Sequence, residues 1–511
     1  MNLALSKKRI IERLAFHKSG KPRGWVRLIV FNEQRAVRRS FHRIVYKKNH
    51  QVRPSFQNWL IDSSIKPIAE TVRQSMPTLE ETVKNWRWKP DPDASTLLAS
   101  NVIALTISEH LNHADPRLMI SVSHDHYRKI TGGVQLCLQY EEVVANSEHV
   151  TYMQIHPWHP LPRLAHAEED PDNLVAIVLN GKDFGVCRMS ALISAMIQIT
   201  ASNVSNAAVK MTVAIHQMLG HMPEQLEALI RVSNTPCIFW LHDFFSICPS
   251  PTLQRNNITF CGAPPVNSNA CELCIYGDER RTHITRIQAL IDGLNVNVVS
   301  PSEVTAAFWS TRSGMSKFPV HVIPHVTLNF IPRPVELVAS SDRLVRVAYL
   351  GFPNKHKGWH FFEEIVRVCS SRGVYEFFVM SSEPAPKSIP VRWVEVSVTA
   401  ENPCAMVEAI ANEKIDLVLH WPTWPETFSF TTFEALAGSA YVITNKNSGN
   451  VAAAVRQTGR GVILGDKIEL IRYFESCEAG DLARSRRVAN QKYSIKQHQS
   501  KMSFELLKKE N

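Results

Sequence analysis

From Arg117 onward, short apolar runs alternate with longer stretches whose apolar residues recur at helical spacing. The runs are short enough for buried strands, and the stretches between them favour amphipathic helices. The first series predicts strands over residues 118–123, 150–155, 174–179, 209–215, 237–241, 296–299 and 321–323. It predicts helices over residues 134–145, 189–200 and 223–232.

A second series of the same kind begins near Arg343. It predicts strands over residues 345–350, 375–380, 393–398, 415–419, 441–444 and 461–464. It predicts helices over residues 359–370, 403–412, 427–437, 450–457 and 468–476. Strands that alternate with helices at this spacing form right-handed βαβ units and a parallel sheet. We therefore expect two doubly wound α/β domains that face a cleft, with ligands bound at the carboxyl ends of the strands.

Length and composition bound the number of domains. With 511 residues, a prior of about 150 residues per domain gives two to four domains. Hydrophobic residues make up 44% and charged residues 20%, which excludes wholesale disorder. The Pro-rich stretch at residues 331–334 predicts an interdomain linker. The predicted regions are a basic accessory helical region and linker (1–110), an N-terminal Rossmann-like domain (111–335), a C-terminal Rossmann-like domain (336–480) and a helical tail (481–511).

The net charge of +10 is unevenly distributed along the chain. Residues 1–53 carry 15 Lys and Arg against 2 Asp and Glu, a net +13, so the remainder is close to −3. Such a segment can bind an anionic membrane surface or nucleic acid, or it can be a solvated basic helix without a partner. Nucleic acid is the less favoured partner, because aromatic residues that stack on bases are sparse in this segment.

The chain carries no sign of membrane insertion. No apolar run approaches the roughly 20 residues that span a bilayer. The N-terminus also lacks the apolar core and small-residue cleavage site of a signal peptide. We expect a cytoplasmic protein, either free or peripheral to the inner membrane.

Two glutamates, Glu426 and Glu434, are separated by seven residues at a predicted strand–helix junction. The first is predicted just before the helix and the second two turns inside it. A helix N-terminus offers free N–H groups and a partial positive charge, which suit a diphosphate. Eight helical residues span about 12 Å, which is comparable to the reach of a nucleotide sugar from hexose to ribose. The alternative is a solvated pair of helical glutamates.

The sequence around this pair resembles glycosyltransferase family 4, a group of retaining enzymes with two Rossmann-like domains (the GT-B fold). The family has Glu-x7-Glu within a segment that ends in Glu-Ala-x-Ala-x-Gly, and this chain has P-T-W-P-E-T-F followed by E-A-L-A-G over residues 422–438. The resemblance implies that Glu426 contacts the donor sugar and Glu434 the ribose. It also implies that the diphosphate meets backbone amides at Thr427, Phe428 and Ser429.

A second match is G-F-P-N-K-H-K-G at residues 351–358. It resembles the family's G-R-x4-K-G segment, which follows the first strand of the C-terminal domain. Lys357 matches the lysine that pairs with the leaving diphosphate. Phe352 stands where the family has arginine, and Lys355 or His356 is the candidate for the missing charge.

Two weaker matches lie in the N-terminal half. Gly132 and Gly133 resemble the family's glycine-rich loop, where the backbone approaches the donor closely, and a simple turn is the alternative. His242 matches the family's strand-end histidine near the donor sugar, and Asp243 is a candidate to orient its ring. The alternative is a structural His-Asp pair. No role is assigned to His216.

Four cysteines lie in a segment rich in Pro, Asn and Gly. Their spacing is C-x12-C-x9-C-x2-C, at Cys248, Cys261, Cys271 and Cys274. The last two form a good half-site for a structural zinc ion, and the spacing of the other half is looser. Free or buried thiols and redox chemistry are the alternatives.

The resemblance implies transfer of a hexose-type sugar from a nucleoside-diphosphate donor to a glycan or lipid-linked glycan acceptor. It implies retention at the anomeric carbon and no cofactor or metal in catalysis. Bacterial surface-polysaccharide assembly is the favoured setting. Two alternatives stay open. One is a nucleotide-sugar-binding protein without turnover, since Phe352 replaces an expected cation. The other is a nucleic-acid-binding protein that acts through the basic N-terminus.

Overall fold

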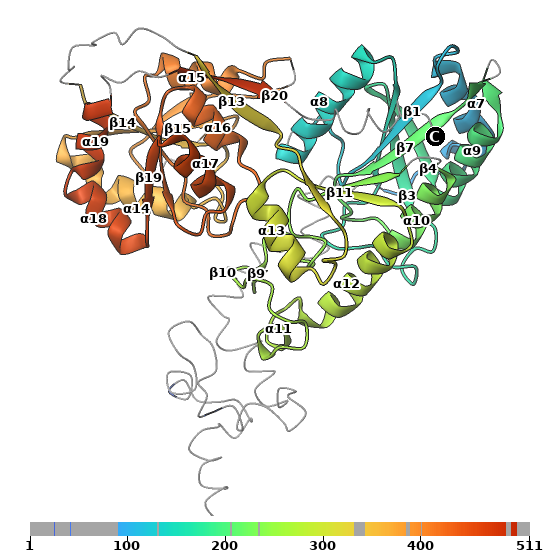
Figure 1. Cartoon of the computed structure of the whole chain (residues 1–511), viewed down its shortest axis with the longest axis horizontal. Coiled ribbons are helices and arrows are strands. Elements are labelled where there is room, and N and C mark those ends of the chain that lie inside the picture. Colours follow the sequence, from blue (N-terminus) through green and yellow to red (C-terminus); the bar gives the residue numbers. More distant parts are fainter. Residues whose placement is uncertain are drawn as a thin grey trace, which may run out of the picture. The chain divides into compact units, whose positions relative to one another are not determined.

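The computed structural model describes residues 90–129, 132–204, 207–233, 236–331, 343–384, 389–399, 401–486 and 492–497, together with Trp25 and Phe41. Within these residues the chain is an α/β protein with two large, mostly parallel sheets (Figure 1). The two sheets belong to one compact unit, and the segment Ile247–Thr285 clusters separately from it.

The first sheet has eight strands in the order β12-β11-β8-β7-β1-β2-β3-β4. Its strands are β1 (Arg117–Val122), β2 (Thr151–Pro157), β3 (Leu174–Leu179), β4 (Lys182–Arg188), β7 (Lys210–Ile215), β8 (Cys237–Trp240), β11 (Val296–Ser300) and β12 (Val320–Val322). Its helices are α7 (Ser100–His110), α8 (Gly133–Ser147), α9 (Met189–Ala201), α10 (Pro223–Val232), α12 (Gly277–Asp292) and α13 (Glu303–Arg312). The predicted elements of the first series are confirmed to within a few residues at their ends.

One edge of this sheet differs from the prediction. Strands β3 and β4 run antiparallel to their neighbours, whereas the alternation of strands and helices predicted a parallel sheet. Asn180 and Gly181 join them with φ angles of 45° and 79°. A two-residue type I′ turn needs positive φ at both positions, which Asn-Gly favours. The resulting strand β4 is only partly buried and was not predicted.

The second sheet has six parallel strands in the order β16-β15-β14-β17-β18-β19. Its strands are β14 (Val345–Leu350), β15 (Tyr375–Ser381), β16 (Arg392–Glu395), β17 (Leu417–Leu419), β18 (Tyr441–Asn445) and β19 (Gly461–Leu464). Its helices are α14 (Trp359–Cys369), α15 (Ala405–Asn412), α16 (Phe430–Ala437), α17 (Asn450–Thr458), α18 (Lys467–Glu475) and α19 (Glu478–Arg486). The expected fold class, with two doubly wound sheets, is confirmed.

Both faces of the second sheet are covered by helices, which explains why its strands are apolar throughout rather than alternating. Side chains on a strand point to opposite faces in turn. On β14, Val345 and Val347 therefore pack in the cluster that includes α14 and α18. Ala348 and Leu350 pack in the cluster that includes α16.

A strand near the C-terminus pairs with a strand in the middle of the chain. Strand β13 (Val326–Ile331) pairs antiparallel with β20 (Lys492–Gln497). The tail was predicted to be helical, and residues 492–497 form a strand instead. Residues 332–334 of the predicted linker lie outside the described residues.

The basic segment at residues 1–53 lies outside the described residues except for Trp25 and Phe41. In the predicted accessory region, the described helix α7 packs against α9 of the first sheet. No helix among the described residues is both long and apolar enough to cross a membrane.

The Ile247–Thr285 segment has little regular structure of its own. It contains the short strands β9 (Gln254–Arg255) and β10 (Thr259–Phe260), the single-turn helix α11 (Asn269–Glu272) and the first part of α12.

Candidate active site

The loop between β17 and α16 carries Glu426 and three of the predicted donor-binding residues, Thr427, Phe428 and Ser429. The helix begins at Phe430, because Ser429 is its N-cap and its Oγ accepts a hydrogen bond from the amide of Thr432. The prediction that the helix starts at Thr427 is therefore wrong, and the eight-residue helical span between the two glutamates does not exist. Glu426 lies in the loop, and Glu434 is the fifth residue of the helix.

Glu426 is fixed through its backbone. It forms a parallel bridge with Gly449, and its carbonyl accepts a hydrogen bond from Asn450 N at 2.9 Å. A Cβ on Gly449 would lie 2.6 Å from that carbonyl oxygen, and its φ of 63° also requires glycine. The side chain accepts a hydrogen bond from Trp424 Nε1 at 3.0 Å. Burial raises the pKa of Glu426, and the charge of Lys357 opposes the rise.

Glu434 is equally buried, with 5% of its surface exposed. Burial raises its pKa to about 7, and again the charge of Lys357 opposes the rise. Within the described part of the chain, no hydrogen bond satisfies its carboxyl group.

Lys357 comes from the loop between β14 and α14. Gly358, with φ of 86°, allows this loop to pack closely against Trp421. A Cβ at this position would lie 2.0 Å from the Trp421 carbonyl oxygen, so only glycine fits. The amide of Thr423 donates to the carbonyl of His356 at 2.9 Å. These contacts hold Lys357 where its charge acts on both glutamates.

The other candidate residues of this loop differ in exposure. Lys355 is exposed, and burial of part of its side chain lowers its pKa. Phe352, in the place of the family's arginine, is 56% exposed. Burial lowers the pKa of His356 to about 4, so this side chain is neutral and does not replace the missing cation.

His420 joins the site without having been predicted. It follows β17 directly, and burial lowers its pKa to about 3. Its Nδ1 lies 3.3 Å from Thr431 Oγ1, whereas its buried Nε2 has no hydrogen-bond partner among the described residues. A histidine immediately after an apolar strand was the signal that could have identified it.

In the N-terminal half, His242 follows β8 and lies in a stack of rings. His242 and His325 are stacked with centroids 5.0 Å apart, and His325 is stacked on Phe430 at 5.6 Å. Trp240 stacks on His242 at 5.5 Å. Burial lowers the pKa of His242 well below its ordinary value and that of His325 to about 3. Both rings are therefore neutral.

A buried carboxylate, that of Glu141, is connected to this stack through His216. His242 Nε2 lies 2.9 Å from His216 Nδ1, and His216 Nε2 lies 3.2 Å from Glu141 Oε2. Glu141 also accepts hydrogen bonds from Ser121 and Tyr152. Burial alone would raise its pKa, but the contacts with His216, Ser121 and Tyr152 outweigh burial and lower it. Glu141 is therefore held as an anion beside the ring of His216.

Asp243, the residue proposed to orient His242, has other partners. Its carboxyl accepts hydrogen bonds from Gln217 Nε2 at 2.6 Å and from the amide of Phe245 at 2.8 Å. Burial raises its pKa to about 7. His216, to which no role was assigned, makes the ring contact with His242 instead.

The glycine-rich loop and Thr427 join the two halves. Gly132 is the N-cap of α8, and a Cβ on Gly133 would lie 3.4 Å from the ring of Phe430. Thr427 Oγ1 donates a hydrogen bond to the carbonyl of His242. The carbonyl of Thr427 accepts a hydrogen bond from Ser302 Oγ at 2.7 Å. Through these two hydrogen bonds Thr427 links the two halves of the site.

Phe428 packs among aromatic rings. It is stacked on Phe433 at 4.8 Å and meets His325 edge-on at 5.0 Å.

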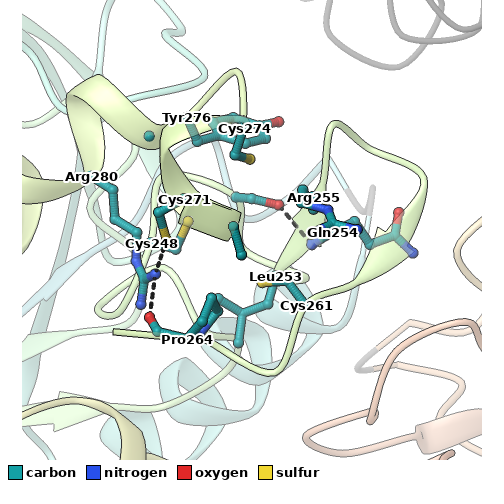
Figure 2. Close-up of a pocket in the computed structure, with 13 residues that line it drawn as sticks. Cys248, Leu253, Gln254, Arg255, Cys261, Pro264, Cys271, Cys274, Tyr276 and Arg280 are labelled. Atoms are coloured by element: carbon teal, nitrogen blue, oxygen red, sulfur yellow. Dashed lines mark hydrogen bonds between the residues drawn. The ribbon is translucent and has the colours of Figure 1, made fainter. Parts of the chain in front are cut away.

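One group here could hold a metal ion. The Sγ of Cys137 and ring nitrogens of His242 and His325 lie within 4.8 Å of one another. The planes of the two imidazoles are inclined by only 23°. Nitrogen lone pairs lie in the ring plane, so one ring would have to turn before both could reach a common ion. The four cysteines predicted as metal ligands line a single cavity in the Ile247–Thr285 segment (Figure 2).

Comparison with solved structures finds distant similarities. HepE of Anabaena in complex with UDP-glucose is 12% identical, covering 73% of this chain and 93% of that chain, with a TM-score of 0.42. A glycosyltransferase from Rickettsia africae is 10% identical (73% and 92% covered, TM-score 0.41). The catalytic domain of starch synthase IV from Arabidopsis thaliana, bound to ADP and acarbose, is 12% identical (77% and 98% covered, TM-score 0.39).

No protein-family model matches the chain, and a search of curated proteins finds no match. At these identities and TM-scores no residue role is transferred from the solved structures, and the fold class stands on the sheet topology.

Proposed function

We propose that this chain is a retaining glycosyltransferase of the GT-B type that uses a nucleoside-diphosphate sugar as donor. One observation supports this most. Lys357, from one loop, acts by its charge on two buried glutamates, Glu426 and Glu434, from another. A nucleotide sugar needs these groups, because a cation binds its diphosphate and carboxylates accept from its sugar and ribose hydroxyls.

In this proposal the leaving diphosphate lies between Lys357 and the N-terminus of α16. Phe430 and Thr431 begin that helix, and the amides of a first helical turn have no intrahelical partner. Their partial positive charge adds to that of Lys357 as the phosphate takes up negative charge. Lys355, exposed at the loop surface, is proposed to approach the donor phosphates from outside.

The sugar is transferred with retention of configuration. The bond from the anomeric carbon to the diphosphate breaks, an oxocarbenium-like centre forms, and the acceptor hydroxyl attacks from the same face. The leaving phosphate takes the proton of that hydroxyl. Glu426 positions the sugar through its hydroxyls, and Glu434 accepts hydrogen bonds from the ribose.

The neutral state of His242 fits this chemistry. A cationic ring beside a positive centre would oppose its formation, whereas a neutral imidazole can exchange hydrogen bonds with a sugar hydroxyl. Because burial keeps the pKa of His242 well below its ordinary value, the ring stays uncharged at physiological pH.

The proposed acceptor is a glycan or lipid-linked glycan of bacterial surface-polysaccharide assembly. The net +13 of residues 1–53 suits docking of a cytoplasmic enzyme on an anionic inner leaflet. Deleting these residues is expected to abolish co-sedimentation with vesicles containing anionic lipid and to leave binding of the nucleotide unchanged. Undiminished vesicle binding by the shortened chain would contradict the docking proposal.

The test of the main proposal is a donor screen. Purified protein is mixed with a panel of nucleotide sugars, and release of nucleoside diphosphate is followed together with thermal shift. Release with one donor, abolished in Glu426→Ala, is the expected result. An NMR assignment of the product's anomeric configuration then checks retention.

The second candidate is a nucleotide-sugar-binding protein without turnover. It is favoured by Phe352, an exposed apolar side chain where the family has a cation. A thermal shift without release of diphosphate, with a full set of acceptors present, would favour this candidate. Neither signal with any donor would overturn both.

A further inference from the structure

Four cysteines gather around one cavity in the Ile247–Thr285 segment, although they are spread over 27 positions of sequence. Figure 2 shows the side chains of Cys248 and Cys271 next to each other, with Cys261 and Cys274 on the other walls. All four are free thiols in the structure.

Each of these sulfur atoms has an N–H group nearby. For three of them it is the backbone amide two residues further along the chain: Ser250 for Cys248, Ala263 for Cys261, and Tyr276 for Cys274, whose sulfur also lies near the amide of Asn256. For the fourth, the Nη1 of Arg280 lies 2.7 Å from the Sγ of Cys271. A neutral thiol is a weak acceptor, whereas a thiolate bound to a metal accepts strongly. The repeated arrangement is therefore suited to thiolates.

Arg280 supplies a second, independent argument. It is 3% exposed, and its guanidinium otherwise contacts only the carbonyls of Ile247 at 3.1 Å and Pro264 at 2.8 Å. Among the described residues it has no carboxylate partner. A buried guanidinium is costly without a counter-charge. Four neutral thiols supply none, whereas a zinc ion with four thiolates carries a net charge of −2.

The fold of this segment also needs a cross-link. Its elements between Ile247 and Tyr276 are two strands of two residues and one helix of four residues. Such short elements bury little apolar surface, and small regions of this kind are stabilised by a structural metal or by disulfides.

We propose that Cys248, Cys261, Cys271 and Cys274 bind one structural Zn²⁺ tetrahedrally, with Arg280 as the counter-charge. Binding replaces the four thiol protons, which pass to solvent. Zinc with Zn–S bonds of 2.3 Å places its sulfurs about 3.8 Å apart. No three of the four sulfurs lie within 4.8 Å of one another among the described residues, so the cysteine side chains turn inward on binding. Four protein ligands leave no open position for chemistry.

The experiment measures metal in the full chain purified under reducing conditions. Mass spectrometry of the elements is expected to find about one zinc per chain. Cys271→Ser and Cys274→Ser are each expected to lower the zinc content at least fivefold. Cys404→Ser, at an exposed cysteine outside the segment, is the matched control and keeps its zinc.

A second readout covers variants that fail to fold. Replacing the zinc of the wild-type chain by Co²⁺ is expected to give the intense thiolate-to-cobalt absorption and the visible bands of a tetrahedral S4 site. Arg280→Met is expected to lose zinc to a chelator 10–100 times faster than wild type, and Arg280→Lys less so.

Three results would overturn the proposal. The first is wild-type protein without metal in which all four thiols react at once with a thiol reagent. The second is a disulfide between any two of the four found by peptide mass spectrometry of the native protein. The third is stoichiometric iron in place of zinc.

Discussion

The N-terminal half of the candidate site is a stack of neutral rings, whereas the C-terminal half gathers ionisable groups around a lysine. Each half combines buried side chains with a partly exposed one, His242 in the first and Lys357 in the second. Burial keeps His242 and His325 uncharged, and they lie among other aromatic rings. Glu426 and Glu434 are buried like His325, but the charge of Lys357 opposes the rise of their pKa values.

The difference suggests a division of tasks in sugar transfer. The reaction centre gains positive charge at the sugar and negative charge at the leaving phosphate. Neutral rings on one side leave the positive centre unopposed, and a cation on the other side stabilises the leaving group.

Removing the carboxyl of Glu426 is expected to have the largest effect. Glu426→Gln keeps the shape of the side chain and its contact with Trp424 Nε1 but loses the negative charge. We expect kcat for release of diphosphate to fall about 1,000-fold, with little change in Tm. Unchanged turnover would remove Glu426 from the site. Glu408→Gln, on the exposed surface of α15, is the control.

Removing the cation of Lys357 comes next. Lys357→Met is expected to lower kcat about 100-fold, because the leaving diphosphate loses a charge partner. The loss should be smaller with donors whose leaving group has a lower pKa. Lys446→Met, at an exposed lysine, should stay within about twofold of wild type. Equal losses in the two variants would contradict a specific role for Lys357.

The third prediction tests the ring stack through Glu141, which contacts His242 by way of His216. Glu141→Gln removes the carboxylate charge beside His216 Nε2, so the hydrogen bond between His216 and His242 can rearrange. We expect kcat to fall about tenfold through misplacement of His242, together with a changed pH profile. A purely structural role would lower Tm and leave the pH profile of the remaining activity as it is.

The smallest expected effect is on stability and depends on pH. Because burial raises the pKa of Glu434 to about 7 in the folded chain, the folded state holds its proton more tightly than the unfolded state. The stability that this proton contributes is complete below about pH 4.5 and is lost as pH rises to about 7. Glu434→Gln stays neutral throughout.

The difference in free energy of unfolding between Glu434→Gln and wild type should therefore change with pH. It should shift in favour of the variant by on the order of 3 kcal/mol as pH rises from 4.5 to 7.5. Denaturant unfolding across this range measures it. Glu408→Gln should show no such gain, and a gain of equal size there would contradict the assignment to Glu434.

The pattern of apolar runs predicted the two sheets well, because strands that are buried on both faces appear in the sequence as nearly continuous apolar runs. The pattern failed where local hydrogen bonds and turns determine where an element begins. The helix start moved from Thr427 to Phe430 because the side chain of Ser429 caps the helix. Strand β4 was missed because it is half exposed, although Asn180 and Gly181 before it form a recognisable hairpin signal.

The site was predicted in part for a similar reason. Motif matches located Glu426, Glu434 and Lys357, whose grouping needs only the ends of neighbouring parallel strands. The contact of His216 with Glu141 links residues 75 positions apart, and no spacing in the sequence reports such a pair. Asp243 was chosen as the partner of His242 because it is adjacent in sequence, yet its carboxyl binds Gln217.

The pairing of β13 with β20 has a mechanical consequence. A single extended chain can rotate about each of its bonds, but a ribbon of two hydrogen-bonded strands resists torsion and bends only across its face. The segment that follows His325 is stiffened in this way over six residue pairs by residues 492–497. Ending the chain before Lys492 would remove one of the two strands and leave β13 unpaired. Such a truncation is therefore expected to loosen the segment that begins beside His325, more than 160 residues away in sequence.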